Sequence, residues 1–100
     1  MIRHILMLQP SPTASAEAIE ACRVALAGLV GRIPGLIDFH WGQNLGPVSR
    51  RDGLSHGFSM DFDDMASLEA YGPHPAHREA AALVTATFSR IVVFDLPLDA

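Results

Sequence analysis

Apolar residues predominate over residues 2–9, which predicts a β-strand whose successive side chains point to opposite faces. One face of this strand carries Ile2, His4, Leu6 and Leu8. From residue 16 to about residue 33 the apolar positions recur every three or four residues, which predicts an amphipathic helix. Ser15 is placed to cap this helix and Pro34-Gly35 to end it. The chain therefore begins with a strand and a helix.

Two further strands are predicted over residues 36–42 and 55–62. In the first, Ile37, Phe39 and Trp41 alternate with Leu36, Asp38 and His40. In the second, one face carries His56, Phe58, Met60 and Phe62. The polar residues 44–53 between them have the length and composition of an open loop that joins paired strands.

The second half of the chain predicts a helical segment broken in two, followed by a strand. A short helix begins after Asp63 or Asp64 and ends at Gly72-Pro73. A longer helix begins at Pro75, which suits a first helical position because it lacks an N–H group, and runs to about residue 90. The inward stripe of this helix is His77, Ala81, Val84 and Phe88. Residues 91–96 form a last strand that is apolar on both faces.

The element order β-α-β-β-α-β predicts an α+β, ferredoxin-like fold as one domain over residues 1–100. Two helices would cover one face of a four-stranded antiparallel sheet. Ile5, Met7 and one side of the last strand would leave the other face apolar, and such a patch normally marks an interface. We therefore expect a homodimer through the sheet face, giving a dimeric α/β barrel. The alternative is a monomer with an apolar sheet.

The amino-acid composition limits the classes of partner that the protein is expected to bind. The net charge of −4 argues against nucleic acid and against an anionic membrane surface. No stretch has the length of a membrane span. The single Cys22 cannot form an internal disulfide, and the chain opens with a strand rather than a signal peptide, so we expect a cytoplasmic protein. Nothing in the sequence indicates a cofactor, so we predict none.

The candidate chemistry is concentrated in residues 71–77, which hold Tyr71, His74 and His77. His77 would lie in the first turn of a helix, where the helix dipole and partial burial both disfavour imidazolium. A neutral imidazole is a suitable general base for removing a proton next to a carbonyl group. The Tyr71 hydroxyl would donate to the oxygen on which negative charge develops.

Other roles for the histidines stay open. His4, on the helix-facing side of the first strand, would bracket a small pocket with His77. An interior histidine is also commonly satisfied by a backbone carbonyl, without any catalytic role. His74 would also fix the start of its helix. A metal site built from His74 and His77 with His4 or Asp95 is a further alternative, but no metal-binding motif supports it, so we predict no metal.

Several motifs resemble the stress-responsive A/B barrel (Dabb) family over essentially the whole chain. They are Ile2-Arg3-His4-Ile5, Ile33-Pro34-Gly35, Trp41-Gly42-Gln43-Asn44, Tyr71 with His74-Pro75-Ala76-His77, and Val92-Val93-Phe94-Asp95. The resemblance implies the fold and the dimer derived above. Within the family, the chain resembles polyketide cyclases of the olivetolic acid cyclase type, which close a poly-β-ketone by aldol condensation.

The cyclase resemblance implies roles for individual residues. Tyr71 and His77 match the catalytic tyrosine and histidine, His4 matches a further pocket histidine, and Asp95 matches an acidic residue beside it. We assign His4, Asp95 and His74 to substrate binding. Gly72-Pro73 and residues 44–53 depart from the cyclase pattern. The predicted function is a cofactor-free cyclase or lyase, with a non-catalytic ligand-binding or stress-responsive dimer, or a cofactor-independent monooxygenase, as alternatives.

Overall fold

The computed structural model describes residues 1–98 and contains four strands and four helices. In chain order they are β1 (Ile2–Pro10), α1 (Ala16–Ala27), β2 (Leu36–Gln43), α2 (Val48–Arg51), β3 (His56–Phe62), α3 (Met65–Tyr71), α4 (Pro75–Thr87) and β4 (Phe88–Pro97). The predicted β-α-β-β-α-β order is confirmed, with α3 and α4 as the two parts of the broken second helix.

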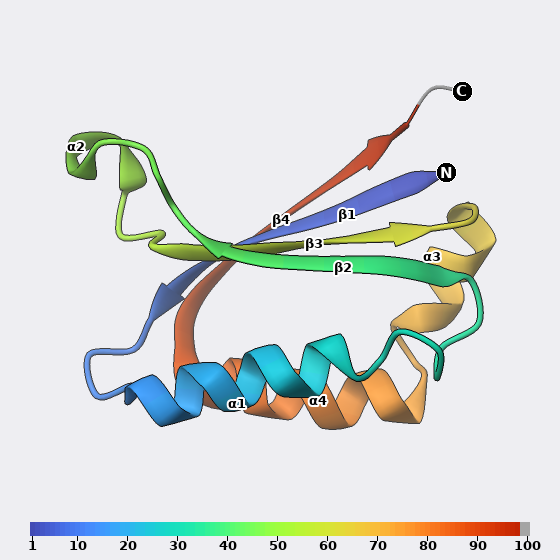
Figure 1. Cartoon of the computed structure of the whole chain (residues 1–100), viewed down its shortest axis with the longest axis horizontal. Helices are drawn as coiled ribbons and strands as arrows, with labels where there is room; N and C mark the ends of the chain where they lie inside the picture. Colours follow the sequence, from blue (N-terminus) through green and yellow to red (C-terminus); the bar gives the residue numbers. More distant parts are fainter. Residues whose placement is uncertain (99–100) are drawn as a thin grey trace.

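The four strands form one antiparallel sheet in the order β2-β3-β1-β4, which is the ferredoxin-like arrangement. Figure 1 shows α1 and α4 lying together beneath one face of this sheet, with α3 at one end and α2 at the other. The opposite face carries no helix among residues 1–98. None of the described helices has the length and apolar character needed to cross a lipid bilayer.

The core lies between the sheet and the two long helices. Its fully buried side chains are Leu8, Cys22, Leu26, Leu29, Met60 and Phe62. Each large apolar side chain in such a position contributes about 1.5–3 kcal/mol relative to an exposed one. Ser15 caps α1 by accepting a hydrogen bond from the backbone of Ala18, and Asp64 caps α3 through Ser67, as the sequence pattern predicted.

Helix α1 is shorter than predicted. It ends at Ala27, where the backbone N–H of Gly28 donates to the Val24 carbonyl at 3.0 Å and that of Leu29 to the Leu26 carbonyl at 3.1 Å. Glycine is a poor helix former, which explains why the helix does not run to residue 33. Ile33 is buried nonetheless, because the turns that follow the helix return it to the core.

A bulge in β2 changes which residues face the core. Leu36 pairs with Phe62 and Asp38 with the neighbouring Asp61, so Ile37 is an extra residue in the ladder. Leu36 is consequently buried, whereas Ile37 is 44% exposed. The prediction that Ile37 shares a face with Phe39 and Trp41 was wrong for this reason.

The junction between α4 and β4 has no connecting loop. The helix ends at Thr87 and the strand begins at Phe88, which was predicted to lie on the helix. Phe88 is still buried, at 3% exposure, and packs against Trp41 with ring centroids 6.2 Å apart. The backbone N–H of Ser11 donates to the Thr87 carbonyl at 2.9 Å, which ties the junction to the segment after β1.

The connection between β2 and β3 contains a helical turn, α2, rather than an open loop. Asp52 follows it in the left-handed conformation, with φ at 51°. The Asn44 side chain donates to the carbonyl of Leu54 at 2.9 Å, which closes the base of the connection. Arg90 reaches across from β4 to the Asp52 carboxylate at 2.9 Å.

Candidate active site

A pocket of about 190 Å³ lies between α4 and the helix-facing side of the sheet. Four polar side chains line it, namely His4, Tyr71, His77 and Thr85. Much of the remaining wall is apolar and includes Leu26 and Phe58. The structure therefore brings together the tyrosine and the two histidines that the sequence singled out, from β1, α3 and α4.

Tyr71 stands between the two histidine rings. Its ring centroid lies 4.1 Å from that of His77 and 5.9 Å from that of His4, and it packs against Phe62 at 5.0 Å. The residue is 4% exposed, and this burial raises the pKa of the Tyr71 phenol well above its ordinary value. The hydroxyl therefore stays protonated at neutral pH and acts as a donor, not as a base.

The Tyr71 hydroxyl has no hydrogen-bond partner among residues 1–98. Within the same part of the chain, no fully buried side-chain nitrogen or oxygen lacks a partner. The hydroxyl is therefore not sealed in the core but reaches accessible space at the pocket. A ligand oxygen in the pocket is a natural acceptor for its proton.

His77 is oriented by a backbone carbonyl. Its Nδ1 atom lies 2.8 Å from the carbonyl oxygen of Gly72. A carbonyl can only accept a hydrogen bond, so Nδ1 carries the hydrogen, and in the neutral ring Nε2 holds the free lone pair. The Gly72-Pro73 turn brings that carbonyl to the first turn of α4, which begins at Pro75 as predicted.

His4 is held in the same way, but by a carboxylate. His4 and Asp95 are direct cross-strand partners on β1 and β4, and His4 Nδ1 lies 2.5 Å from Asp95 Oδ1. The His4 side chain is 14% exposed and that of Asp95 40%. An ionised carboxylate accepts the Nδ1 hydrogen, so Nε2 of a neutral His4 is also left as the acceptor.

His74 lies outside the pocket lining. Its Nδ1 atom accepts a hydrogen bond from the backbone N–H of Ala76 at 3.1 Å, so the side chain caps α4. This contact accounts for a histidine at position 74, although it does not test a role in substrate binding. Within residues 1–98 no three potential metal-ligating side chains cluster.

The remaining histidines lie on opposite faces of the sheet. His40 lies on the outer face, with Nε2 3.0 Å from Asp38 Oδ2. His56 lies on the helix-facing side beside Phe88 and Trp41, and partial burial lowers its pKa. The alternation of His56 with Phe58 along the strand is the sequence signal that places it on this face.

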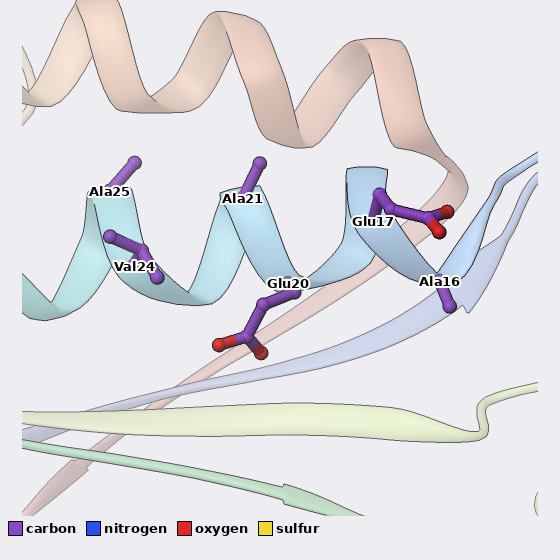
Figure 2. Close-up of a pocket in the computed structure, with 6 residues that line it drawn as sticks. All are labelled: Ala16, Glu17, Glu20, Ala21, Val24 and Ala25. Atoms are coloured by element: carbon purple, nitrogen blue, oxygen red, sulfur yellow. The ribbon is translucent and has the colours of Figure 1, made fainter.

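A larger hollow, of about 650 Å³, lies on the outer surface of α1. Figure 2 shows its lining as side chains of this one helix, mainly alanine and glutamate. It is an open surface with no histidine or tyrosine, so it lacks the base and donor that the smaller pocket brings together. The candidate active site is therefore the pocket that contains Tyr71.

Comparison with known protein families shows the family to which the chain belongs. The family described as Stress responsive A/B Barrel Domain matches residues 2–98. This chain belongs to the stress-responsive A/B barrel family. The match confirms the resemblance drawn from the His-Pro-Ala-His run and the other short motifs.

Two relatives of this A/B barrel chain cover most of its length. The stress-response A/B barrel domain-containing protein HS1 of Arabidopsis thaliana is 29% identical over 94% of the chain and 86% of its own length. Olivetolic acid cyclase of Cannabis sativa is 21% identical over 94% of the chain and 93% of its own length.

Solved structures confirm the fold. A protein of unknown function from Jannaschia sp. CCS1, described as dimeric and ferredoxin-like, superposes with a TM-score of 0.85 at 31% identity. That match covers 97% of this A/B barrel chain and 98% of the other. The hydroxynitrile lyase of Passiflora edulis shares the fold with a TM-score of 0.88 at 24% identity, covering 98% and 93%.

Proposed function

We propose that this protein is a cofactor-free lyase or cyclase in which His77 is the general base. The observation that carries the proposal is the hydrogen bond from His77 Nδ1 to Gly72, because it leaves Nε2 as the free base beside Tyr71. A base and a hydroxyl donor then share one small apolar pocket, which is the arrangement that proton removal next to a carbonyl requires.

His77 and Tyr71 are sufficient for the proton transfer and charge stabilisation of an aldol condensation. His77 Nε2 takes the proton from the carbon next to a carbonyl group, and the C–H electrons form an enolate whose oxygen accepts a hydrogen bond from Tyr71. The enolate carbon then attacks a second carbonyl, which forms a C–C bond, and the new alkoxide takes the proton back from His77. The reverse sequence cleaves the same bond. His4, held by Asp95, orients the substrate.

The relatives accord with this chemistry. One curated relative is named olivetolic acid cyclase and one solved relative is named hydroxynitrile lyase, so the fold accommodates enzymes of both kinds. A polyketide-like substrate closed by aldol condensation is the specific form of the proposal that the cyclase relative suggests.

The test is a panel of β-polyketone thioesters, free acids and small hydroxy-carbonyl compounds, scored for cyclised or cleaved product over buffer. His77→Ala is expected to lose roughly 10²–10⁴-fold in rate, as removal of a general base typically does. Tyr71→Phe should lose less, because only the hydroxyl is removed. Arg50→Ala on α2 is the control, since Arg50 is exposed and does not line the pocket. Product formation that survives His77→Ala unchanged would remove the mechanism.

A second candidate function is non-catalytic ligand binding in the same pocket. The contact between His77 and Gly72 also favours it, because a backbone carbonyl is the usual partner of a purely structural histidine. Absence of turnover on the whole panel, together with saturable binding of a panel member, would decide for this alternative.

We also propose that the chain forms a homodimer through the outer face of the sheet. On β1 and β4 this face presents an apolar ridge of Met7, Val92, Phe94 and Leu96, and Phe94 is 56% exposed. On β2 and β3 the same face has a groove of about 490 Å³ at the paired glycines Gly42 and Gly57. A two-fold axis would seat each ridge in the other groove, which is the self-complementarity that a symmetric dimer needs. The dimeric Jannaschia relative accords with this.

A further inference from the structure

We propose that the pocket at Tyr71 selects an uncharged carbonyl compound no larger than about one substituted aromatic ring, and rejects carboxylates and phosphorylated carriers. This inference rests on the proposed function for its carbonyl chemistry and narrows its substrate class: among the panel compounds it favours the small hydroxy-carbonyl compounds over the β-polyketone thioesters and the free acids. Three features of the pocket support this inference. They are the absence of arginine and lysine from its lining, the His74 cap at the N-terminus of α4, and its volume.

The charge of the pocket disfavours anions. No arginine lines it, and the chain contains no lysine. The Asp95 carboxylate contacts His4, which lines the pocket, and so adds a negative charge next to it. An ionised group that leaves water for such a site loses hydration without gaining a cationic partner, which costs several kcal/mol.

Two of the arginines on the sheet and on α1 have acidic partners outside the pocket. Arg3 donates to both Asp61 oxygens on the outer face of the sheet, at 2.9 and 3.1 Å. Arg23 pairs with Glu20 on α1. Neither therefore supplies a cation to the pocket.

The positive end of α4 is also closed. A helix N-terminus is a common anion site because its first N–H groups lack partners. Here the His74 side chain accepts from the Ala76 N–H at 3.1 Å, and the carbonyl of His74 accepts from Arg78. Two backbone N–H groups in the first turn of α4 are therefore already bonded to His74 and are not free to bind an anion.

The volume of the pocket limits the size of the ligand that fits inside it. An apolar cavity of about 150 Å³ in another protein holds benzene. The pocket here is about 190 Å³ and opens to solvent, so a single ring with a small carbonyl substituent fills it and a long poly-β-ketone would extend beyond it. His4 and His77 lie beside Tyr71, the Thr85 hydroxyl donates to the backbone of α4, and the rest of the wall is apolar, such as Leu26 and Phe58. This favours a ligand that is polar at one end only.

The test uses isosteric ligands that do not react. Benzamide and benzoate have nearly the same shape but differ in charge, and their binding to the wild-type protein is measured by NMR titration at mildly alkaline pH. We expect benzamide to bind at least roughly tenfold more tightly than benzoate, the smallest ratio that an unpaired buried charge should give. Equal binding, tighter binding of benzoate, or failure of benzamide to bind at millimolar concentration would each overturn the inference.

A charge-insertion variant makes the test specific to this pocket. Thr85 lines the pocket from α4, and lysine is a better helix former than threonine, so Thr85→Lys should fold. It should raise the affinity for benzoate relative to benzamide by roughly tenfold. Val48→Lys adds the same charge on α2, at a residue that is 77% exposed, and should leave the ratio unchanged. A ratio that changes equally in both variants would place the binding elsewhere.

Size is tested with 4-phenylbenzamide, which adds a second ring to the same amide. It should bind at least roughly tenfold more weakly than benzamide, since overfilling a packed site is costly. Equal or tighter binding would overturn the size limit. Because these ligands do not react, the charge and size preferences are measured whether or not His77→Ala changes any rate, so failure of the proposed function and failure of this inference remain distinguishable.

Discussion

The Nδ1 atom of His77 donates to the carbonyl oxygen of Gly72 over 2.8 Å, and this contact decides which ring nitrogen faces the pocket as a base. We predict that neutral His77 is the Nδ1–H tautomer. The measurement is a long-range ¹⁵N–¹H correlation spectrum of the imidazole rings. His74 is an internal control, because its Nδ1 accepts a hydrogen bond from Ala76 and its neutral ring must therefore carry the hydrogen on Nε2. Observation of Nε2–H at His77 would contradict the proposed base.

Alkaline stability should depend on Tyr71. Burial raises the pKa of its phenol above the ordinary value of 10.0, so above that pH the unfolded chain releases a proton that the folded chain keeps. This contribution to stability is complete below pH 10.0 and is lost as the pH rises toward the folded-state pKa. Denaturant melts across this range should show the loss in the wild type and a flatter profile in Tyr71→Phe. Because Tyr71 is the single tyrosine of the chain, tyrosinate absorbance reports it directly. Parallel profiles would show that the phenol is not desolvated.

Phe88 should be a principal contributor to the core. Phe88→Ala is expected to cost about 3–5 kcal/mol in the free energy of unfolding, the usual range for a buried aromatic residue. Arg50→Ala, at an exposed position on α2, should stay within roughly 0.5 kcal/mol. Urea melts of the two variants measure both values. Similar effects for the two substitutions would contradict the burial of Phe88.

The dimer should depend on the apolar ridge of the outer face. Phe94→Asp places a charge at a half-exposed position of that ridge and should shift sedimentation toward the monomer. Leu45→Asp makes the same kind of change at a residue that is 95% exposed in the connection between β2 and α2, and should leave the dimer intact. A wild-type protein that sediments as a stable monomer at micromolar concentration would remove the dimer proposal itself.

The sequence predicted the order of the elements well because periodicity and breakers agreed. Pro75 begins α4 and Asp64 caps α3, and both are local signals that act within one turn. The ends of elements were less predictable. Phe88 satisfies the apolar period of a helix and of a strand equally, and only its packing against Trp41 and the pairing of β4 with β1 decide for the strand. The bulge at Ile37 likewise depends on pairing with β3.

The members of the candidate site were predictable from the sequence, but their orientation was not. His4, Tyr71 and His77 were singled out by residue type and spacing, and the structure places all three at one pocket. The partner of His77 is a main-chain carbonyl, whose direction depends on the path of the Gly72-Pro73 turn. The pairing of His4 with Asp95 depends on the register between the first and last strands, which no local signal reveals.

The missing loop between Thr87 and Phe88 has a mechanical consequence. His77 near the start of α4 and Asp95 near the end of β4 belong to one continuous stretch of regular structure, and Ser11 anchors its midpoint. Because no flexible loop separates α4 from β4, the two elements have no hinge between them. We therefore expect His77 and Asp95 to move together in collective motions of the chain. Inserting a flexible glycine-serine linker at this corner should therefore uncouple the motions of His77 and Asp95, the two ends of the proposed site.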